Sequence, residues 1–275
     1  MNRGALAWVV LLFISSGGVL LVAGSAAGAP TTSKASKATK ATKKATKKPA
    51  HHHHQRGRAP SFPGDATADA SPASRAARLT ESECYAELER DHVRFEKAGP
   101  SPGILIPVRL TGPVRGVAYR TDFPDKQRSK VPWEVFDCRL VVALAAWSPT
   151  LAAHGIDEVR MFSAWRPPSP HFPAGKVATA HPGGLAADLR LFKRGSEPPL
   201  DVLADFNGRI GTVPCGKGAA PPIPDTPAAR TLHEIYCAAA DAHLFHVQLC
   251  PDHDGPHRNH FHVEVRPAVR WFIVE

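Results

Sequence analysis

Apolar residues recur at helical spacing in three parts of the chain, and signals for helix starts and stops bound each part. The first has a capping box, Thr80-Glu-Ser-Glu83, ahead of Cys84, Leu88 and Phe95, and it should end at Gly99-Pro100. The other two helices are expected at about residues 132–148 and 226–243; the last opens with an N-cap threonine and a proline at the first helical position.

Shorter apolar runs rich in β-branched and aromatic residues predict strands between these helices. Turn sequences at Thr111-Gly-Pro113 and Arg166-Pro-Pro168 bound two of the runs. The strands are expected near residues 104–108, 114–119, 158–165, 186–192, 245–249 and 261–265. Because helices and short strands mix without a βαβ rhythm, we predict an α+β domain over residues 80–275.

The first third of the chain does not have the pattern of a folded core. Residues 1–29 carry an early positive charge at Arg3 and then a long apolar run, which predicts an export signal. The run approaches the roughly 20 residues of a membrane span, so an uncleaved N-terminal anchor through residues 5–24 is the alternative. Residues 30–79, rich in Lys, Ala and Pro, are expected to be a disordered linker.

The net charge of +9 is concentrated in this linker. On an exported protein its lysines would meet anionic polymers of the cell envelope or lipid headgroups rather than nucleic acid. A solvated spacer that maintains solubility is the plainer interpretation. The tract His51–His54 has metal-binding residue types, but we interpret it as a feature of the linker and assign it no catalytic role.

The folded part contains five cysteines: Cys84, Cys138, Cys215, Cys237 and Cys250. Export makes disulfides plausible, and an odd count leaves one thiol free or paired with another chain. A bond between Cys84 and Cys138 would tie the first two helices together, but the sequence alone does not fix the connectivity. No two cysteines have the close spacing that cysteine-type zinc sites use.

Two histidine-bearing segments carry the candidate chemistry. In His181-Pro-Gly-Gly-Leu-Ala-Ala-Asp188 the glycines allow a tight turn, and the strand that follows should point Asp188 toward the same side as His181. In His257-Arg-Asn-His-Phe-His262 the side chains of His260 and His262 share one face of a strand. Two imidazoles and a carboxylate, with one position open for water, are the donor set of a catalytic zinc site.

The spacing of these two segments resembles the bacterial group of zinc proteins that includes D-Ala-D-Ala metallopeptidases, lysostaphin and hedgehog proteins. More closely, the chain resembles the bacterial extensin-like C-terminal domain over residues 80–267. The similarity includes the Trp147 helix, the Phe162-Ser-Ala-Trp-Arg166 strand and the Asn259-His-Phe-His262 ending. Thr179 stands where the first motif usually has serine, and a proline-rich insertion lies between Gly216 and Pro227.

The resemblance implies a small antiparallel sheet flanked by helices, in a zinc fold like that of the hedgehog proteins and D-Ala-D-Ala peptidases. It implies His181, Asp188 and His262 as ligands of Zn²⁺. His260 would be the general base, or would stabilise charge on the attacked carbonyl, and His257 would support it. Arg166 and Thr179 would contact substrate, Arg166 by holding a carboxylate.

Together the motifs and the export signal predict a zinc metallopeptidase of the periplasm or cell envelope. It would hydrolyse amide bonds in the peptides of peptidoglycan, as a carboxypeptidase or an endopeptidase. Two alternatives stay open. The domain could be a cell-wall-binding module that keeps the zinc but has no turnover, or a structural envelope protein stabilised by disulfides. We interpret His171, His246 and His253 as surface or packing residues, and Asp252 and Asp254 as loop carboxylates.

Overall fold

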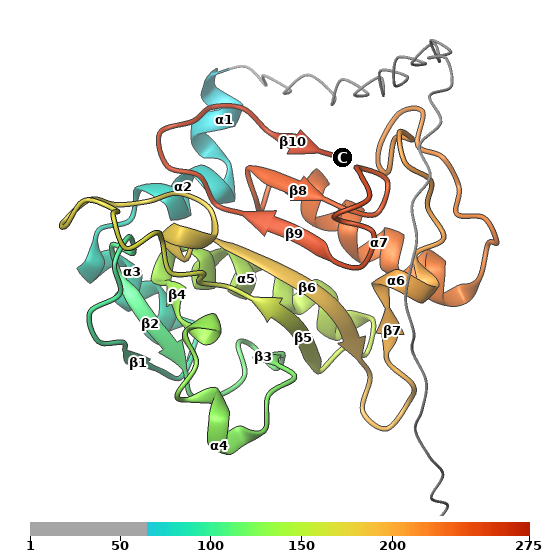
Figure 1. The fold of residues 1–275 in the computed structure, drawn as a ribbon. Helices are drawn as coiled ribbons and strands as arrows, with labels where there is room; N and C mark the ends of the chain where they lie inside the picture. The colour runs from blue at the N-terminus through green and yellow to red at the C-terminus, as the bar shows by residue number, and fades with distance from the viewer. Residues whose placement is uncertain (1–64) are drawn as a thin grey trace, which may run out of the picture. The chain divides into compact units, whose positions relative to one another are not determined.

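The computed structural model describes residues 65–275, which form an α+β domain (Figure 1). The predicted fold class is therefore confirmed. The export signal or anchor, most of the linker and His51–His54 lie outside the described residues. Within residues 65–275 no helix has the length and apolar character needed to cross a bilayer.

The main sheet has seven strands, in the order β10-β8-β9-β6-β5-β3, with β7 paired to β6 as well. Its members are β3 (Ala118–Thr121), β5 (Glu158–Ser163), β6 (Ala186–Lys193), β7 (Leu200–Asp201), β8 (Val247–Leu249), β9 (Phe261–Glu264) and β10 (Ile273–Val274). The central pairs are antiparallel as predicted, but β3 pairs with β5, and β10 with β8, in parallel. The expected antiparallel sheet is thus a mixed one.

A second, three-stranded sheet and the helices complete the domain. The small sheet is antiparallel and consists of β1 (Phe95–Lys97), β2 (Pro107–Leu110) and β4 (Phe136–Asp137). The α-helices are α1 (Asp65–Ala70), α2 (Pro72–Arg78), α3 (Glu81–Arg90), α4 (Asp125–Arg128), α5 (Cys138–Ala153), α6 (Val202–Asp205) and α7 (Pro227–Asp241). Two short 3-10 turns, η1 (Pro132–Glu134) and η2 (His181–Gly183), lie before β4 and β6.

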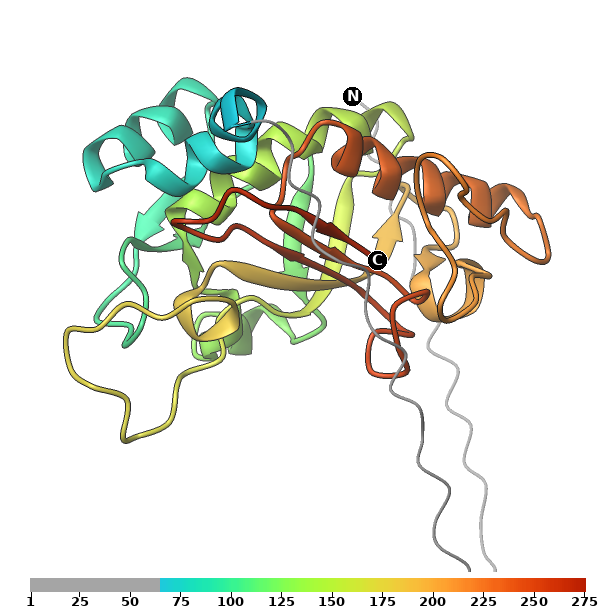
Figure 2. The ribbon, with the colours of Figure 1, turned by 90° about the horizontal axis from the view of Figure 1, so that it is seen from above.

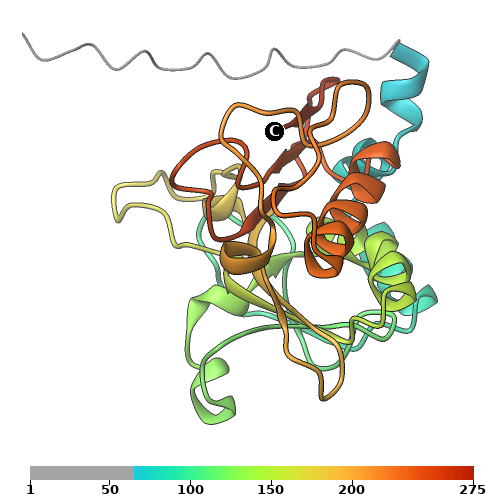
Figure 3. The same ribbon diagram turned by 90° about the vertical axis from the view of Figure 1, so that its right-hand side faces the viewer.

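Helices α5 and α7 lie on one face of the main sheet, with α2 and α3 packed on α5, and the loops, η2 and the short helix α4 lie on the other side (Figures 2 and 3). On the covered face Trp147 of α5 is fully buried, and its indole N–H donates to the carbonyl of Ile235 in α7 (3.0 Å). Its ring meets Phe192 and Phe245 edge to face. This apolar layer leaves the opposite face of the sheet available for polar side chains.

The linker ends earlier than predicted, because α1 and α2 occupy residues that the sequence analysis assigned to it. Ser71 caps α2 by accepting the backbone N–H of Ser74 (3.1 Å), and Pro72 takes the first helical position. The alanine-rich sequence reads as a linker, but its small side chains let α2 pack closely on α5, with Ala73 and Ala76 buried. Folding thus begins well before Thr80.

The capping box at Thr80 is confirmed, but the helix it starts ends at Arg90 rather than at Gly99. The backbone of His92 adopts a positive φ of 54°, which turns the chain out of the helix. Phe95 then lies in β1 and stacks on Tyr85 of α3, with ring centroids 5.4 Å apart. Phe95, which fitted the helical pattern in the sequence, therefore belongs to a strand and packs against the helix.

The second predicted helix divides into three elements: η1, β4 and α5. The carboxylate of Asp137 accepts the backbone N–H of Arg139 (3.1 Å), so the helix starts at Cys138. It continues through Pro149 to Ala153. The third predicted helix agrees with α7, where Thr226 is the N-cap and Pro227 the first helical residue.

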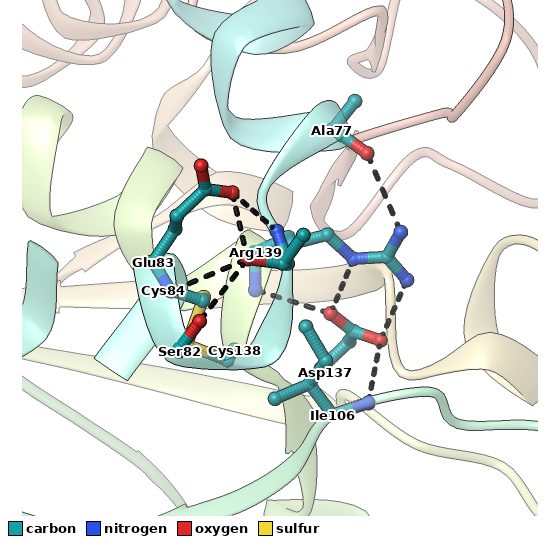
Figure 4. The surroundings of a disulfide bond; sticks show 9 residues. Ala77, Ser82, Glu83, Cys84, Ile106, Asp137, Cys138 and Arg139 are labelled. Atoms are coloured by element: carbon teal, nitrogen blue, oxygen red, sulfur yellow. Dashed lines mark hydrogen bonds and ion pairs between the residues drawn. A yellow bond between two sulfur atoms is a disulfide. The ribbon is translucent and has the colours of Figure 1, made fainter. Parts of the chain in front are cut away.

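Two disulfides link the elements. Cys84 and Cys138 are bonded and join α3 to the start of α5 (Figure 4). The second disulfide joins Cys215, in the loop before α7, to Cys237 within α7. Cys250 is the free thiol among the described residues, and it is buried.

A buried ion pair lies beside the first disulfide (Figure 4). The guanidinium of Arg139 donates to both carboxylate oxygens of Asp137 at 2.8 Å, and the two side chains are 5% and 0% exposed. The Asp137 carboxylate also accepts the backbone N–H of Ile106 (3.3 Å), and Arg139 reaches the carbonyl of Ala77 in α2 (3.4 Å). The backbone N–H of Asp137 donates to the carbonyl of Gly184, so this cluster also supports the turn that carries His181.

Replacing Arg139 by methionine would leave the Asp137 carboxylate buried without its counter-ion. Loss of one partner of a buried pair costs about 3–5 kcal/mol, so we expect Arg139→Met to lower the free energy of unfolding by that amount in urea titrations. The same change at Arg90, whose ion pair with Glu87 is exposed, should leave the unfolding midpoint almost unchanged. Similar midpoints for the two variants would contradict the structural role given to the buried pair.

Candidate metal centre

His181 is presented by the η2 turn, which two glycines make possible. A Cβ atom on Gly183 would lie 2.2 Å from the carbonyl oxygen of Ala178, and Gly184 has a φ of +64° with the Asp137 nitrogen 2.7 Å from its Cβ position. The turn fixes His181 with its Nδ1 at 2.7 Å from the carbonyl oxygen of Ala164. Because a carbonyl only accepts, Nδ1 carries the proton, and Nε2 points toward Asp188 as a lone-pair donor.

The pairing of β6 with β9 brings the other two predicted ligands together. Asp188 lies directly opposite His262 in this antiparallel ladder. The carboxylate of Asp188 is 2% exposed, and its Oδ1 is 3.0 Å from His181 Nε2 and 3.0 Å from His262 Nδ1. His181, Asp188 and His262 offer donor atoms that all lie within 4.8 Å of one another. Residues remote in the sequence thus meet at one point on the open face of the sheet.

His260 faces the same carboxylate from the end of β9. Its Nε2 lies 3.3 Å from Asp188 Oδ1, and its Nδ1 donates to the side-chain oxygen of Asn259 (2.8 Å). For His262 the distal nitrogen, Nε2, faces the carboxylate of Glu264 at 3.7 Å, and Glu264 is held by the guanidinium of Arg266 (2.9 Å). The far nitrogens of His181 and His260 thus have hydrogen-bond acceptors, whereas Glu264 lies beyond hydrogen-bond distance of His262 Nε2 and acts on that ring through its charge.

These outer partners decide which atoms His181 and His260 present to Asp188. In their neutral forms His181 and His260 each turn a nitrogen lone pair toward Asp188 Oδ1, and His262 Nδ1 faces the same oxygen at 3.0 Å. Lone pairs and a carboxylate oxygen repel one another unless a cation or added protons lie between them. Ligand atoms on one tetrahedral zinc ion are about 3.4 Å apart, given bonds near 2.1 Å, and Asp188 Oδ1 lies 3.0 Å from the facing nitrogens of both His181 and His262. The donor set therefore fits a metal ion.

The contacts between Asp188 and the histidines lower the pKa of the carboxyl group and raise that of His262. Burial alone would raise the pKa of Asp188, but the rings of His181, His260 and His262 donate hydrogen bonds to the carboxylate when they are protonated, and this holds its pKa far below the usual range. Burial alone would lower the pKa of His262, yet its contacts with Asp188 and Glu264 outweigh burial and raise it. The Asp188 side chain is thus an anion at every ordinary pH and attracts either protons on the rings or a metal ion.

Arg166 lies at the site, but it contacts Asp188, a proposed metal ligand, and not only the space for a substrate carboxylate. Its Nη2 contacts Asp188 Oδ2, and its Nε donates to the hydroxyl of Ser163 (2.9 Å). The side chain remains 52% exposed. Arg166 therefore orients the carboxylate and still has guanidinium surface facing solvent.

The remaining predicted site residues lie at different distances from the centre. The ring of His257 is 5.2 Å from that of His260 and 5.9 Å from that of His262, and its Nδ1 is 2.6 Å from Asp254 Oδ1. Thr179 is exposed in the loop before η2, where its carbonyl accepts the backbone N–H of Gly183 (3.2 Å). His257 thus borders the centre, whereas Thr179 helps to close the turn.

Sequence reasoning missed Phe162 as a residue of the site. In the β5–β6 ladder Met161 pairs with Leu189 and Ser163 with Asp188, so Phe162 is the extra residue of a β-bulge. Its side chain is 39% exposed, although the strand was predicted to lie in the core. In the sequence, the period-two alternation of the strand already places residue 162 on the open face, and this pattern could have identified Phe162 as a residue of the site.

The exposed ring of Phe162 lies between two polar residues of the site. Its edge meets the ring of His260, with centroids 5.7 Å apart, and the guanidinium carbon of Arg190 lies 5.1 Å from its centroid. Arg190 is held by Asp122 (2.8 Å). An aromatic surface next to the candidate catalytic histidine is thus fixed on both sides.

Comparison with protein-family models, with curated proteins and with solved structures gives no match for the chain.

Proposed function

We propose that the chain is an exported zinc-dependent peptidase that hydrolyses amide bonds in the peptides of peptidoglycan. His181, Asp188 and His262 would hold the zinc. The observation that carries this proposal is the convergence of three imidazole nitrogens on the buried Asp188 carboxylate, a donor set that a metal ion would stabilise. The late histidine pair and the histidine turn also agree with the resemblance to zinc peptidases of the D-Ala-D-Ala and hedgehog type, and the finer fold assignment is part of the proposal.

Zinc with three protein ligands and an open position lowers the pKa of bound water toward neutrality and polarises a substrate carbonyl. Residues that contact the ligand histidines on their far sides orient these ligands. The carbonyl of Ala164 fixes the tautomer of His181, and the Glu264 carboxylate, held by Arg266, lies 3.7 Å behind the ring of His262. Such carboxylate–histidine contacts are typical partners of metal ligands.

His260 is the residue best placed for proton transfer. Asn259 holds its Nδ1, and its Nε2 faces the open side of Asp188. A neutral Nε2 can take a proton from the attacking water and return it to the leaving amine, or the protonated ring can stabilise charge on the attacked carbonyl oxygen. Phe162 covers one edge of the ring and limits its movement.

Substrate would approach over the open face. A groove of about 520 Å³ lies between segments 100–105 and 167–177, and its lining includes Pro167, the residue after Arg166. The exposed part of the Arg166 guanidinium suits a substrate carboxylate, as in the carboxypeptidase alternative. The two disulfides agree with an oxidising compartment, and the basic linker suits an anionic envelope.

The first test measures zinc and hydrolysis together. The purified full chain should bind zinc and release free amino groups from peptidoglycan sacculi, and a chelator should stop the release. Changing His262 to alanine removes a ligand and should abolish activity, whereas His260→Ala should keep the zinc and lower kcat by about 10²–10⁴-fold. His171→Ala, in an exposed loop, is the matched control and should retain both properties.

Hydrolysis that survives in His262→Ala would overturn the assignment. Zinc bound at this centre without cleavage of any muropeptide would favour the wall-binding module, the second candidate function. Such an outcome would agree with the contact between Arg166 and Asp188, which holds one oxygen of the ligand.

Phe162 gives a second test, directed at substrate binding. Aromatic contacts contribute about 0.5–1.5 kcal/mol, so Phe162→Ala should raise KM by roughly 2–12-fold with little change in kcat. Phe162→Tyr keeps the ring and should restore the KM of the parent chain. A fall in kcat at constant KM would instead assign Phe162 to the positioning of His260.

A further inference from the structure

A second group of metal-binding side chains lies in the connection between β8 and β9. His253, Asp254 and His257 offer donor atoms that all lie within 4.8 Å of one another. Their loop lies on the face of the main sheet opposite α5 and α7 (Figures 2 and 3). None of the three is a proposed ligand of the first centre, although the ring of His257 lies 5.9 Å from that of His262.

The separations within this group suit ligands of one ion. His253 Nε2 lies 3.5 Å from Asp254 Oδ2. This is longer than the 2.7–3.2 Å typical of an N–H···O hydrogen bond and close to the roughly 3.4 Å between two ligands of a tetrahedral zinc ion. His257 Nδ1 lies 2.6 Å from Asp254 Oδ1, a hydrogen bond that a metal ion would replace after a small shift of the ring.

An independent observation comes from Glu275, far along the chain. Its Oε2 lies 2.6 Å from His253 Nδ1, and the residue is 8% exposed. Its other carboxylate oxygen is buried and has no hydrogen-bond partner among the described residues. The backbone oxygen of Glu275 accepts from the Cys250 N–H (2.6 Å) and from the Tyr236 hydroxyl (3.0 Å), which fixes the residue in place.

The contact with Glu275 sets the tautomer of His253. A carboxylate that accepts the Nδ1 proton leaves Nε2 with its lone pair directed to Asp254, as in the carboxylate–histidine pairs that orient metal ligands. A carboxylate buried with one unpaired oxygen is costly, and its negative charge favours positive charge on the far side of the His253 ring. The His253 ring thus connects the buried Glu275 carboxylate, on its Nδ1 side, with the Asp254 carboxylate, on its Nε2 side.

We propose that His253, Asp254 and His257 form a second site for a divalent transition-metal ion, with Glu275 as its orienting partner. Two imidazoles and one carboxylate suit zinc, cobalt or nickel better than magnesium or calcium, which prefer oxygen ligands. The side chains are 25%, 40% and 20% exposed, compared with 10%, 2% and 11% for His181, Asp188 and His262. The second site is therefore the weaker of the two.

Metal binding to the full chain tests this site without any activity measurement. The parent should carry His51–His54 replaced by alanine, so that this tract does not bind metal. After removal of metals, equilibrium dialysis against Zn²⁺ with elemental analysis should show two ions per chain. His253→Ala and, separately, Asp254→Asn should each bind one ion fewer than the parent, and His171→Ala should match the parent.

Glu275→Gln keeps the size of the side chain but removes its charge. It should retain the second ion with an affinity about 10–100-fold lower, the usual effect of losing an outer partner. Far-ultraviolet circular dichroism on every variant checks that the fold is retained. The difference between parent and His253→Ala decides the proposal: as many ions in His253→Ala and Asp254→Asn as in the parent would overturn it. This difference does not depend on the first centre, whose own loss is measured by His262→Ala.

Discussion

The register between β6 and β9 is the constraint on which the rest of the site depends. It places Asp188 directly opposite His262, and it leaves Phe261 and Val263 on the covered face, where both are fully buried. A slip by one residue would turn these apolar side chains to solvent and the histidine into the core. The burial of the apolar face under α5 and α7 thus fixes the geometry of the polar face.

On the polar face, residues behind the histidine rings orient the rings toward Asp188. The carbonyl of Ala164 and the side-chain oxygen of Asn259 accept hydrogen bonds from the far nitrogens of His181 and His260, and the Glu264 carboxylate lies 3.7 Å from the far nitrogen of His262. Glu275 has the same relation to His253 in the neighbouring loop. In both places the residues that set the chemistry are acceptors that no metal would touch.

Capping patterns predicted the helix starts at Thr80 and Thr226, and the turn and strand alternation predicted that His181 and Asp188 point to one side. The family resemblance added His262 as the third ligand, and the three donor atoms lie within 4.8 Å of one another. The Cys84–Cys138 disulfide is present, although cysteine positions alone do not fix connectivity. The errors arose where tertiary contacts decide. Phe95 packs from β1 because His92 turns the chain, and the alanines of α2 are ordered because they fit against α5. Glu275 could not be connected with His253, because only the pairing of β10 with β8 brings that part of the chain there.

The most direct measurement of the central claim is a crystal structure of the zinc-loaded chain with anomalous diffraction at the zinc edge. The account predicts an ion held by His181 through Nε2, by Asp188 and by His262 through Nδ1, with Glu264 accepting from the other nitrogen of His262. Density without an ion at Asp188, or with zinc bound to neither His181 nor His262, would contradict it.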